Sequence, residues 1–230
     1  MRSGGTDGHP GHQPSAASGV EAATVPRRSP TPSPAAWVPS ARDARTAKGE
    51  RTRRLVVEAL VDLIDEEGTH PTAKQVAQRA GVSTRLVYHH FGGVHGLLLA
   101  AVALQSERHR YLLFAIPPRG PPALRIKALC RQRRLYFEEM TPVYRVAHAR
   151  AHAEAGLDEL LAGDRMVLRD QLAHTLDPEL ESRGAAGPQL LDALEQATGW
   201  YTWRALRDSR ASSAPSAERA MAYVAERLLG

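Results

Sequence analysis

The segment from residue 72 to residue 91 is the part of the sequence that most constrains the fold. A T-x-x-Q capping box at Thr72 begins a short helix, and Gly81 ends it. After the turn, Ser83 can cap a second helix, which the glycine pair at 92–93 breaks. Two short helices joined by a tight turn that contains glycine form a helix-turn-helix. The sequence therefore predicts this motif within a helical domain.

The chain around this motif has helical rather than strand periodicity. The preceding helix has one apolar face, whose members recur at helical spacing: Val56, Ala59, Leu60, Leu63 and Ile64. No convincing strand or internal repeat follows, and 43% hydrophobic residues are enough for a core. We expect an all-α protein, with a three-helix helix-turn-helix domain at residues 47–93 and a second helical domain at residues 94–230.

The first 46 residues have a different composition. They are rich in Gly, Pro, Ser and Ala, they include the run PRRSPTPSPAAWVP, and they show no sustained apolar periodicity. Such a segment buries too little apolar surface to offset the entropy lost on ordering. We expect residues 1–46 to form a disordered tail.

Cysteine content and apolar runs indicate the compartment. The single cysteine, Cys130, excludes an internal disulfide and fits a reducing environment. No run approaches the roughly 18 apolar residues of a membrane span, and the N-terminus lacks the apolar core of a secretory signal. We therefore expect a cytoplasmic protein without a membrane partner.

The charge distribution favours an anionic partner at the helix-turn-helix. The net charge of +5 permits a nucleic-acid partner without establishing one. Between Glu67 and Glu107 there is no acidic residue, whereas that segment holds Lys74, Arg79, Arg85 and four histidines. A carboxylate there would repel a DNA duplex, so the absence of acids suits a surface that faces phosphate.

In a helix-turn-helix, the second helix enters the major groove with its N-terminal residues against base edges. Val82, Val87 and Phe91 should face the core. We expect the outward side chains of this helix to bind DNA: Ser83, Thr84, Arg85, Leu86, Tyr88 and His89. Arg85 could read guanine through two hydrogen bonds, Thr84 could bond to a base or a phosphate, and Leu86 could meet a thymine methyl.

Other side chains suit contacts with the DNA backbone. Tyr88, His90, Thr72 and Lys74 are placed for phosphate positioning. These features alone leave two interpretations open, because helix-turn-helix geometry also occurs in helical domains that never touch DNA. A Tyr-His-His run is also often a helix end with partly buried rings.

The run from Thr52 to Val102 resembles the DNA-binding domain of the TetR family of bacterial transcriptional regulators. The AGVS turn, the YHHF sequence at 88–91 and the pair at 97–98 match the family's pattern in order and spacing. The resemblance implies a homodimer on a palindromic operator, a fourth helix as connector, and a C-terminal domain that binds an effector and dimerises. Carried over by position, it implies DNA contacts at Thr72, Thr84, Arg85, Tyr88 and His90, with His89 beside them.

Two positions depart from the family's pattern. The family commonly has a lysine just after the YxHF segment, where it meets a phosphate, but Val94 stands there in this chain. Leu86 occupies a position that is more often small or polar. The first departure puts one phosphate contact in doubt, and the second means that no operator sequence can be borrowed from a relative.

The remaining sequence predicts further helices. They are expected at residues 94–114, 123–140, 141–156 and 157–176, followed by a loop to Pro188 and two final helices in QLLDALEQATGWYTWRALRDSR and SAERAMAYVAERLLG. The break after residue 140 rests on Thr141 and Pro142, which can serve as an N-cap and a first-turn proline. The last two helices resemble the pair that forms a four-helix bundle in family dimers.

Polar side chains on apolar faces mark a candidate effector site. Arg133 lies on an apolar stripe, where it is either paired with a carboxylate or available to an anionic ligand, and pairing is the commoner case. Alanines beside Tyr144 and His148 leave room for a small molecule. The candidate effector-binding residues are Arg133, Phe137, Tyr144, His148 and His152.

His148 and His152 are spaced so that they could share a metal ion, but no HExxH glutamate or third ligand accompanies them. We favour a structural or pocket-lining role, and we expect no metal, cofactor or catalytic residue. An enzyme would need a nucleophile and base, or a complete metal site.

The final helices carry the candidate dimer interface: Leu191, Leu194, Tyr201, Met221, Val224 and Leu228. Trp200 and Trp203 are expected in the core or the interface rather than around a ligand. The sequence thus predicts a homodimeric repressor that leaves double-stranded operator DNA when a small-molecule effector binds. The alternatives are an activator, and a helical sensor or interaction protein with weak or no specific DNA binding.

Overall fold

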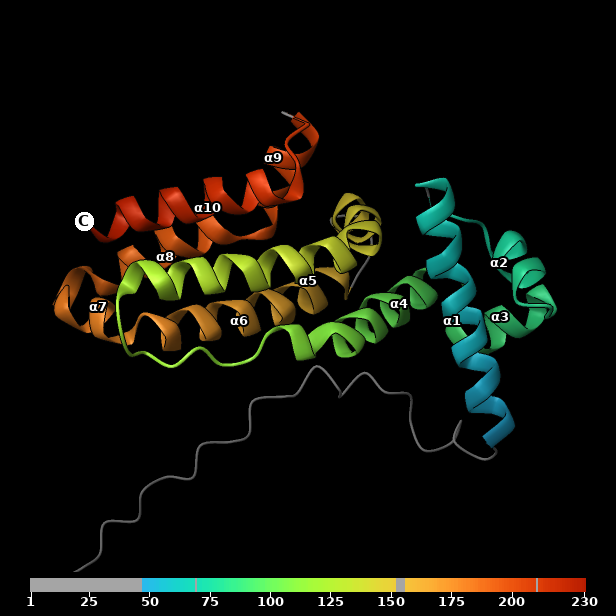
Figure 1. Cartoon of the computed structure of the whole chain (residues 1–230). Coiled ribbons are helices and arrows are strands. Elements are labelled where there is room, and N and C mark those ends of the chain that lie inside the picture. The colour runs from blue at the N-terminus through green and yellow to red at the C-terminus, as the bar shows by residue number, and fades with distance from the viewer. Residues whose placement is uncertain (1–46, 69, 152–155, 210) are drawn as a thin grey trace, which may run out of the picture. The chain divides into compact units, whose positions relative to one another are not determined.

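The computed structural model describes residues 47–68, 70–151, 156–209 and 211–230, and within these ranges it is helical, with no strand (Figure 1). The all-α expectation is confirmed. The expected disordered tail, residues 1–46, lies outside the described residues.

The first three helices form the predicted helix-turn-helix. They are α1 (Ala47–Glu67), α2 (Ala73–Arg79) and α3 (Thr84–Phe91). The Thr72 capping box is complete, and the Ser83 hydroxyl accepts a hydrogen bond from the backbone N–H of Leu86. The core under the turn consists of side chains with no exposed area: Val56, Leu60, Val76 and Val87.

The connector helix, α4 (Val94–His109), is shorter than predicted and is followed by a 3-10 turn, Arg110–Leu112. Its first turn passes close to the end of α3. A Cβ atom added at Gly96 would lie 2.0 Å from the backbone oxygen of Phe91, so no larger residue fits without a shift of backbone. At its other end, Arg108 pairs with Glu58 of α1 at 3.0 Å.

The predicted break at Thr141 and Pro142 is wrong. Helix α5 runs without interruption from Pro122 to Arg150, with Pro142 inside it. Proline removes one backbone hydrogen bond, but the apolar stripe continues on both sides of it, with Phe137 and Val143 both buried. Tertiary packing therefore outweighs the local signal.

The last third of the chain contains more short elements than predicted. After α6 (Leu157–Thr175), the expected loop contains α7 (Asp177–Ser182) and a 3-10 turn, Gly184–Ala186. The next predicted helix is broken into α8 (Gly187–Thr198) and α9 (Trp200–Ser209). The break falls at Gly199, whose backbone is extended and where a Cβ atom would lie 2.8 Å from the Glu195 oxygen.

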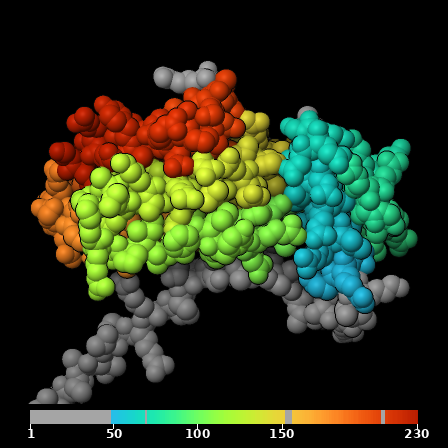
Figure 2. Space-filling view, viewed as in Figure 1, coloured from blue at the N-terminus to red at the C-terminus, as the bar shows by residue number. Residues whose placement is uncertain are grey.

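Helix α10 (Ala214–Leu229) completes the bundle and packs along α5 and α8 (Figure 1). Figure 2 shows α10 and α5 lying side by side on one face. Within the described ranges, no single helix is long and apolar enough to span a membrane, although α3 and α4 with the following turn pass that test as a pair bent by 67°.

Candidate DNA-binding surface and cavity

Helix α3 presents one buried face and one accessible face. Val87 and Phe91 are buried, as predicted, whereas Arg85 and His89 are exposed and Tyr88 is 55% exposed. The N-terminal end of the helix also carries Thr84, which is half-buried. Thr84 and Arg85 lie at the N-terminal end of α3, which a helix-turn-helix directs at base edges, and Tyr88 and His89 lie in its second half.

The start of helix α2 carries another exposed cation. Thr72 and Lys74, at the start of α2, are both exposed. Neither Lys74 nor Arg85 has an ion pair with a residue in the described ranges. By contrast, Arg79 donates hydrogen bonds to both carboxylate oxygens of Glu66. Lys74 and Arg85 are therefore exposed cations that have no described carboxylate to neutralise them.

Three of the expected DNA-binding residues are less accessible than the sequence suggested. Thr84, Leu86 and His90 are half-buried, and the backbone oxygen of His90 accepts a hydrogen bond from Arg53 at 3.0 Å. Ser83 is exposed, and its hydroxyl oxygen accepts the N-cap hydrogen bond from the backbone N–H of Leu86. Contacts of these residues with DNA remain a prediction.

A second candidate site is a cavity of about 330 Å³ between α5, α6, α8 and α9. Arg133, Tyr144 and His148 line it, as the effector-site prediction requires. Phe137 does not, because it lies in the core and packs edge-on against Trp200. His152 falls outside the described residues.

Two further cavity residues follow the break at Gly199. Trp200 is buried in the core, as expected, and it also lines the cavity and stacks on His148 with an angle of 12° between the rings. Tyr201 lines the cavity too, and its hydroxyl lies 3.1 Å from Nδ1 of His148. Tyr201 is exposed, so its place in a dimer interface stays a prediction.

His148 is neutral at physiological pH. Burial, followed by the nearby charge of Arg204, lowers the pKa of this imidazole to about 4. The described residues contain no cluster of three His, Cys, Asp or Glu side chains that could hold a metal ion. His148 is therefore an uncharged, aromatic part of the cavity wall.

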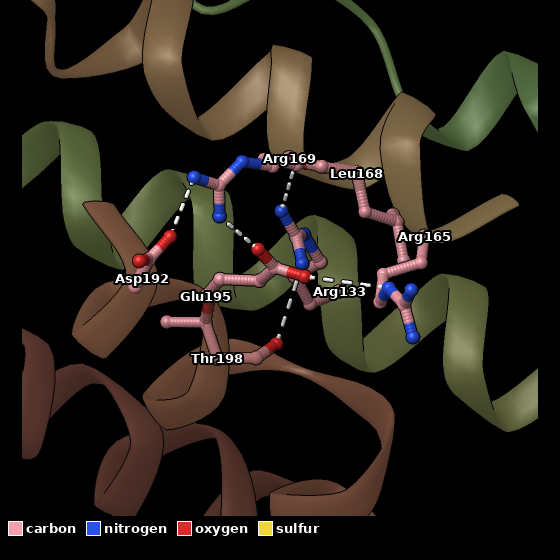
Figure 3. Close-up of polar contacts among 7 residues, drawn as sticks. All are labelled: Arg133, Arg165, Leu168, Arg169, Asp192, Glu195 and Thr198. Carbon is pink, nitrogen blue, oxygen red and sulfur yellow. Dashed lines mark hydrogen bonds and ion pairs between the residues drawn. The ribbon is translucent and has the colours of Figure 1, made fainter. Parts of the chain in front are cut away.

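Arg133 is the most buried charge at this site, with 1% of its surface exposed (Figure 3). Its Nη2 donates to the backbone oxygen of Leu168 at 2.6 Å, and its Nη1 donates to that of Thr198 at 3.4 Å. No carboxylate of the described chain lies within ion-pair distance of it, contrary to the pairing favoured from the sequence. Burial lowers the pKa of the guanidinium to about 10, so it stays charged at neutral pH.

Hydrogen bonds connect the cavity wall to the connector helix. The Tyr144 hydroxyl donates to Oδ2 of the buried Asp164 at 2.9 Å, and the hydroxyl of Ser106, on α4, donates to the same oxygen. Burial raises the pKa of the Asp164 carboxyl, and these two hydrogen bonds oppose that effect. A cavity residue is thus two hydrogen bonds away from α4.

The candidate dimer-interface residues divide into three groups. Leu194 and Met221 have no exposed area, so they belong to the core of this chain and cannot form its surface, contrary to the prediction. Leu191 and Leu228 are half-buried. Val224, which is 45% exposed, stays available on α10, and the neighbouring exposed Tyr223 was not predicted.

Comparisons with known proteins identify the N-terminal region. Residues 56–101 match the family model of bacterial regulatory proteins of the tetR family. The "HTH-type transcriptional regulator BetI" of Brucella abortus (strain 2308) is 29% identical over 177 residues, which are 75% of this chain and 87% of that protein. BetI of Escherichia coli O45:K1 is 36% identical over 81 residues, which are 34% of this chain and 42% of that protein.

Solved structures share the fold. A transcriptional regulator from Rhodococcus sp. Rha1 aligns with a TM-score of 0.62 at 20% identity, covering 77% of this chain and 95% of that one. A putative TetR-family regulator from Mesorhizobium loti aligns with a TM-score of 0.56 at 17% identity, covering 80% and 98%.

Proposed function

We propose that this chain is a TetR-family transcriptional regulator, and that it is a homodimeric repressor released from its operator by a small-molecule effector. The operator would be an inverted repeat in the bacterial cytoplasm. One observation carries the proposal. It is the accessible face of α3, which presents Arg85 and Tyr88 in a segment without acidic residues, together with the exposed Lys74 of α2, which forms no ion pair with a described residue.

Dimerisation supplies the geometry for an inverted repeat. Two recognition helices must lie about 34–36 Å apart to enter successive major grooves on one side of a duplex. An effector that binds a conformation with another spacing more tightly lowers the affinity for DNA, and by no more than its difference in affinity between the two conformations. The cavity beside α5, α6, α8 and α9 is the proposed effector site.

The proposed route from cavity to DNA runs through α4. Tyr144 in the cavity wall and Ser106 on α4 bond to one oxygen of Asp164, so a ligand that displaces the tyrosine changes the support of the connector helix. The other end of α4 packs tightly on α3 through Gly96. A shift of α4 is thereby transmitted to the reading helix.

The test is selection of bound fragments from a random DNA pool by the purified chain, at roughly physiological salt so that non-specific binding is weak. Recovery of an inverted repeat supports the dimeric regulator. Recovery of only salt-labile, unrelated fragments overturns it and favours the sensor or interaction protein, an interpretation that Val94 at the family's lysine position supports.

A further inference from the structure

The charges behind the cavity are not balanced. Three guanidinium groups, those of Arg133, Arg165 and Arg169, converge with two carboxylates, those of Asp192 and Glu195 (Figure 3). Arg169 donates hydrogen bonds to both carboxylates, and Arg165 lies 3.7 Å from Glu195. Arg165 and Asp192 are exposed, so water screens their charges. Among the less exposed groups, the two guanidinium groups of Arg133 and Arg169 face the single carboxylate of Glu195, so one positive charge is left over. Glu195 bonds to Arg169 and acts on Arg133 only as a nearby charge.

The retained charge is best assigned to Arg133. A guanidinium has five N–H donors, and Arg133 uses two groups on backbone oxygens, one of them at the 3.4 Å limit of a hydrogen bond. Its Nε is buried and has no hydrogen-bond partner among the described residues. Because an isolated buried charge is costly, a buried cation usually has an anion or further acceptors beside it.

The residues of the cavity wall carry no charge apart from these: Arg133, Arg165, Glu195 and Asp158. Leu161, Leu168 and Trp200 supply apolar surface, and His148 is neutral. The other acid in the wall, Asp158, is exposed, so water screens its charge. A ligand in this cavity thus contacts apolar and aromatic side chains together with a buried cation.

We propose that the ligand of this cavity is a small organic monoanion, with a carboxylate against Arg133 and an apolar or aromatic body against Trp200 and Tyr144. This inference rests on the proposed effector site and names its ligand class. A single excess charge matches a carboxylate, whereas a phosphate dianion would leave the site negative. Charge-assisted hydrogen bonds to guanidinium are also the strong ones, which fits the use of arginine here.

The test measures binding to the full chain without DNA. Benzoate, phenylacetate and hexanoate are titrated beside their neutral amides and beside benzylamine as a cation. The acids should bind about tenfold or more tightly than the matched amides, because the amides leave the buried guanidinium without an anion. Arg133→Gln should abolish this preference, and Arg133→Lys should retain part of it.

Control variants keep the result interpretable. If Arg133 variants fail to fold, the preference of the unaltered chain for acids over amides still decides the question, and Arg131→Gln, at an exposed position of the same helix outside the cavity wall, should leave it intact. Equal binding of acids and amides, tighter binding of benzylamine, or no binding of any acid at millimolar concentration overturns the inference.

Operator release distinguishes the ligand class of the cavity from the proposed regulatory function. If acids bind but do not release operator DNA, the ligand class stands and effector-driven release fails. If a neutral or cationic compound that occupies the cavity releases DNA, the regulator stands and the carboxylate inference fails.

Discussion

At the scale of single residues, exposure separates side chains that read DNA from those that support the motif. Arg85 is exposed at the N-terminal end of α3, whereas Val87, two residues later, has no exposed area. Tyr88 is exposed too, but a phenol hydroxyl suits a phosphate better than a particular base. The two residues therefore should fail in different ways when they are truncated.

Arg85→Ala should cost about 1–3 kcal/mol of operator affinity and relax discrimination at one base pair, because a guanidinium reads guanine in the major groove. Tyr88→Ala should weaken binding to operator and random DNA alike. Titrations with the operator, single-base variants and random duplex distinguish the two. Equal losses on all duplexes for Arg85→Ala would refute its assignment as a base reader.

His148 should make stability depend on pH. Its folded pKa is about 4 against an ordinary 6.5, so the unfolded chain takes up the proton first as pH falls. The stability from neutral His148 is complete above pH 6.5, falls as the pH drops from 6.5 to about 4, and changes no further below that. Chemical denaturation between pH 7.5 and 4.5 should show a shallower pH dependence for His148→Gln than for the unaltered chain. Parallel curves would contradict this.

At the scale of elements, the sequence predicted the helix boundaries that side-chain caps determine, and it missed the uninterrupted α5 and the break between α8 and α9. The caps at Thr72 and Ser83 lie within a few residues of the groups that they bond, so the helix-turn-helix was correct to its boundaries. The continuity of α5 across Pro142 depends on packing on both sides of the proline, whereas the break at Gly199 has a local signal, the glycine itself, that the prediction did not use. Trp200 and Tyr201 follow that break and line the cavity, so the sequence did not predict this part of the cavity wall.

The junction of α3 with α4 can be tested at Gly96. In an open helix Gly→Ala stabilises by about 1 kcal/mol, but here the new Cβ atom would meet the Phe91 oxygen. We expect Gly96→Ala to destabilise by about 1–3 kcal/mol in urea denaturation, as overpacking does. Ala103→Ser, at a half-buried position of the same helix, is the control and should cost less. A more stable Gly96→Ala chain would show that the two helices do not meet so closely.

The hydrogen-bonded connection between the cavity and α4 can be tested separately from ligand binding. Ser106→Ala removes the hydrogen bond from α4 to Asp164 and leaves the cavity wall unchanged. With an effector identified by release from the operator, its affinity for the free chain should change little. The ratio of operator affinities without and with effector should fall by about fivefold, or about 1 kcal/mol of coupling. An unchanged ratio would assign the coupling to another route.

At the scale of the whole molecule, one chain presents one α3, so reading an inverted repeat requires a second copy. The burial of Leu194 and Met221 narrows the surface available for this contact on the final helices. What stays exposed on α10 is Tyr223 and Val224, with the half-buried Leu228 one turn further along. An apolar contact at Tyr223, Val224 and Leu228 would join two copies through side chains that stay wholly or partly accessible in the single chain.

Val224→Glu should therefore produce a folded monomer that binds the operator weakly. Two copies neutralise about twice as many phosphates as one, so the dependence of log affinity on log salt should be about twice as steep for the unaltered chain as for the variant. Sedimentation at micromolar concentration reports the mass, and operator titrations at several salt concentrations report the slope. Met166→Glu, at a comparably exposed apolar position on α6, should leave both unchanged. If Val224→Glu stays dimeric, the contact between copies lies on another face, and a monomer that retains the full salt slope would remove the dimer from the reading of DNA.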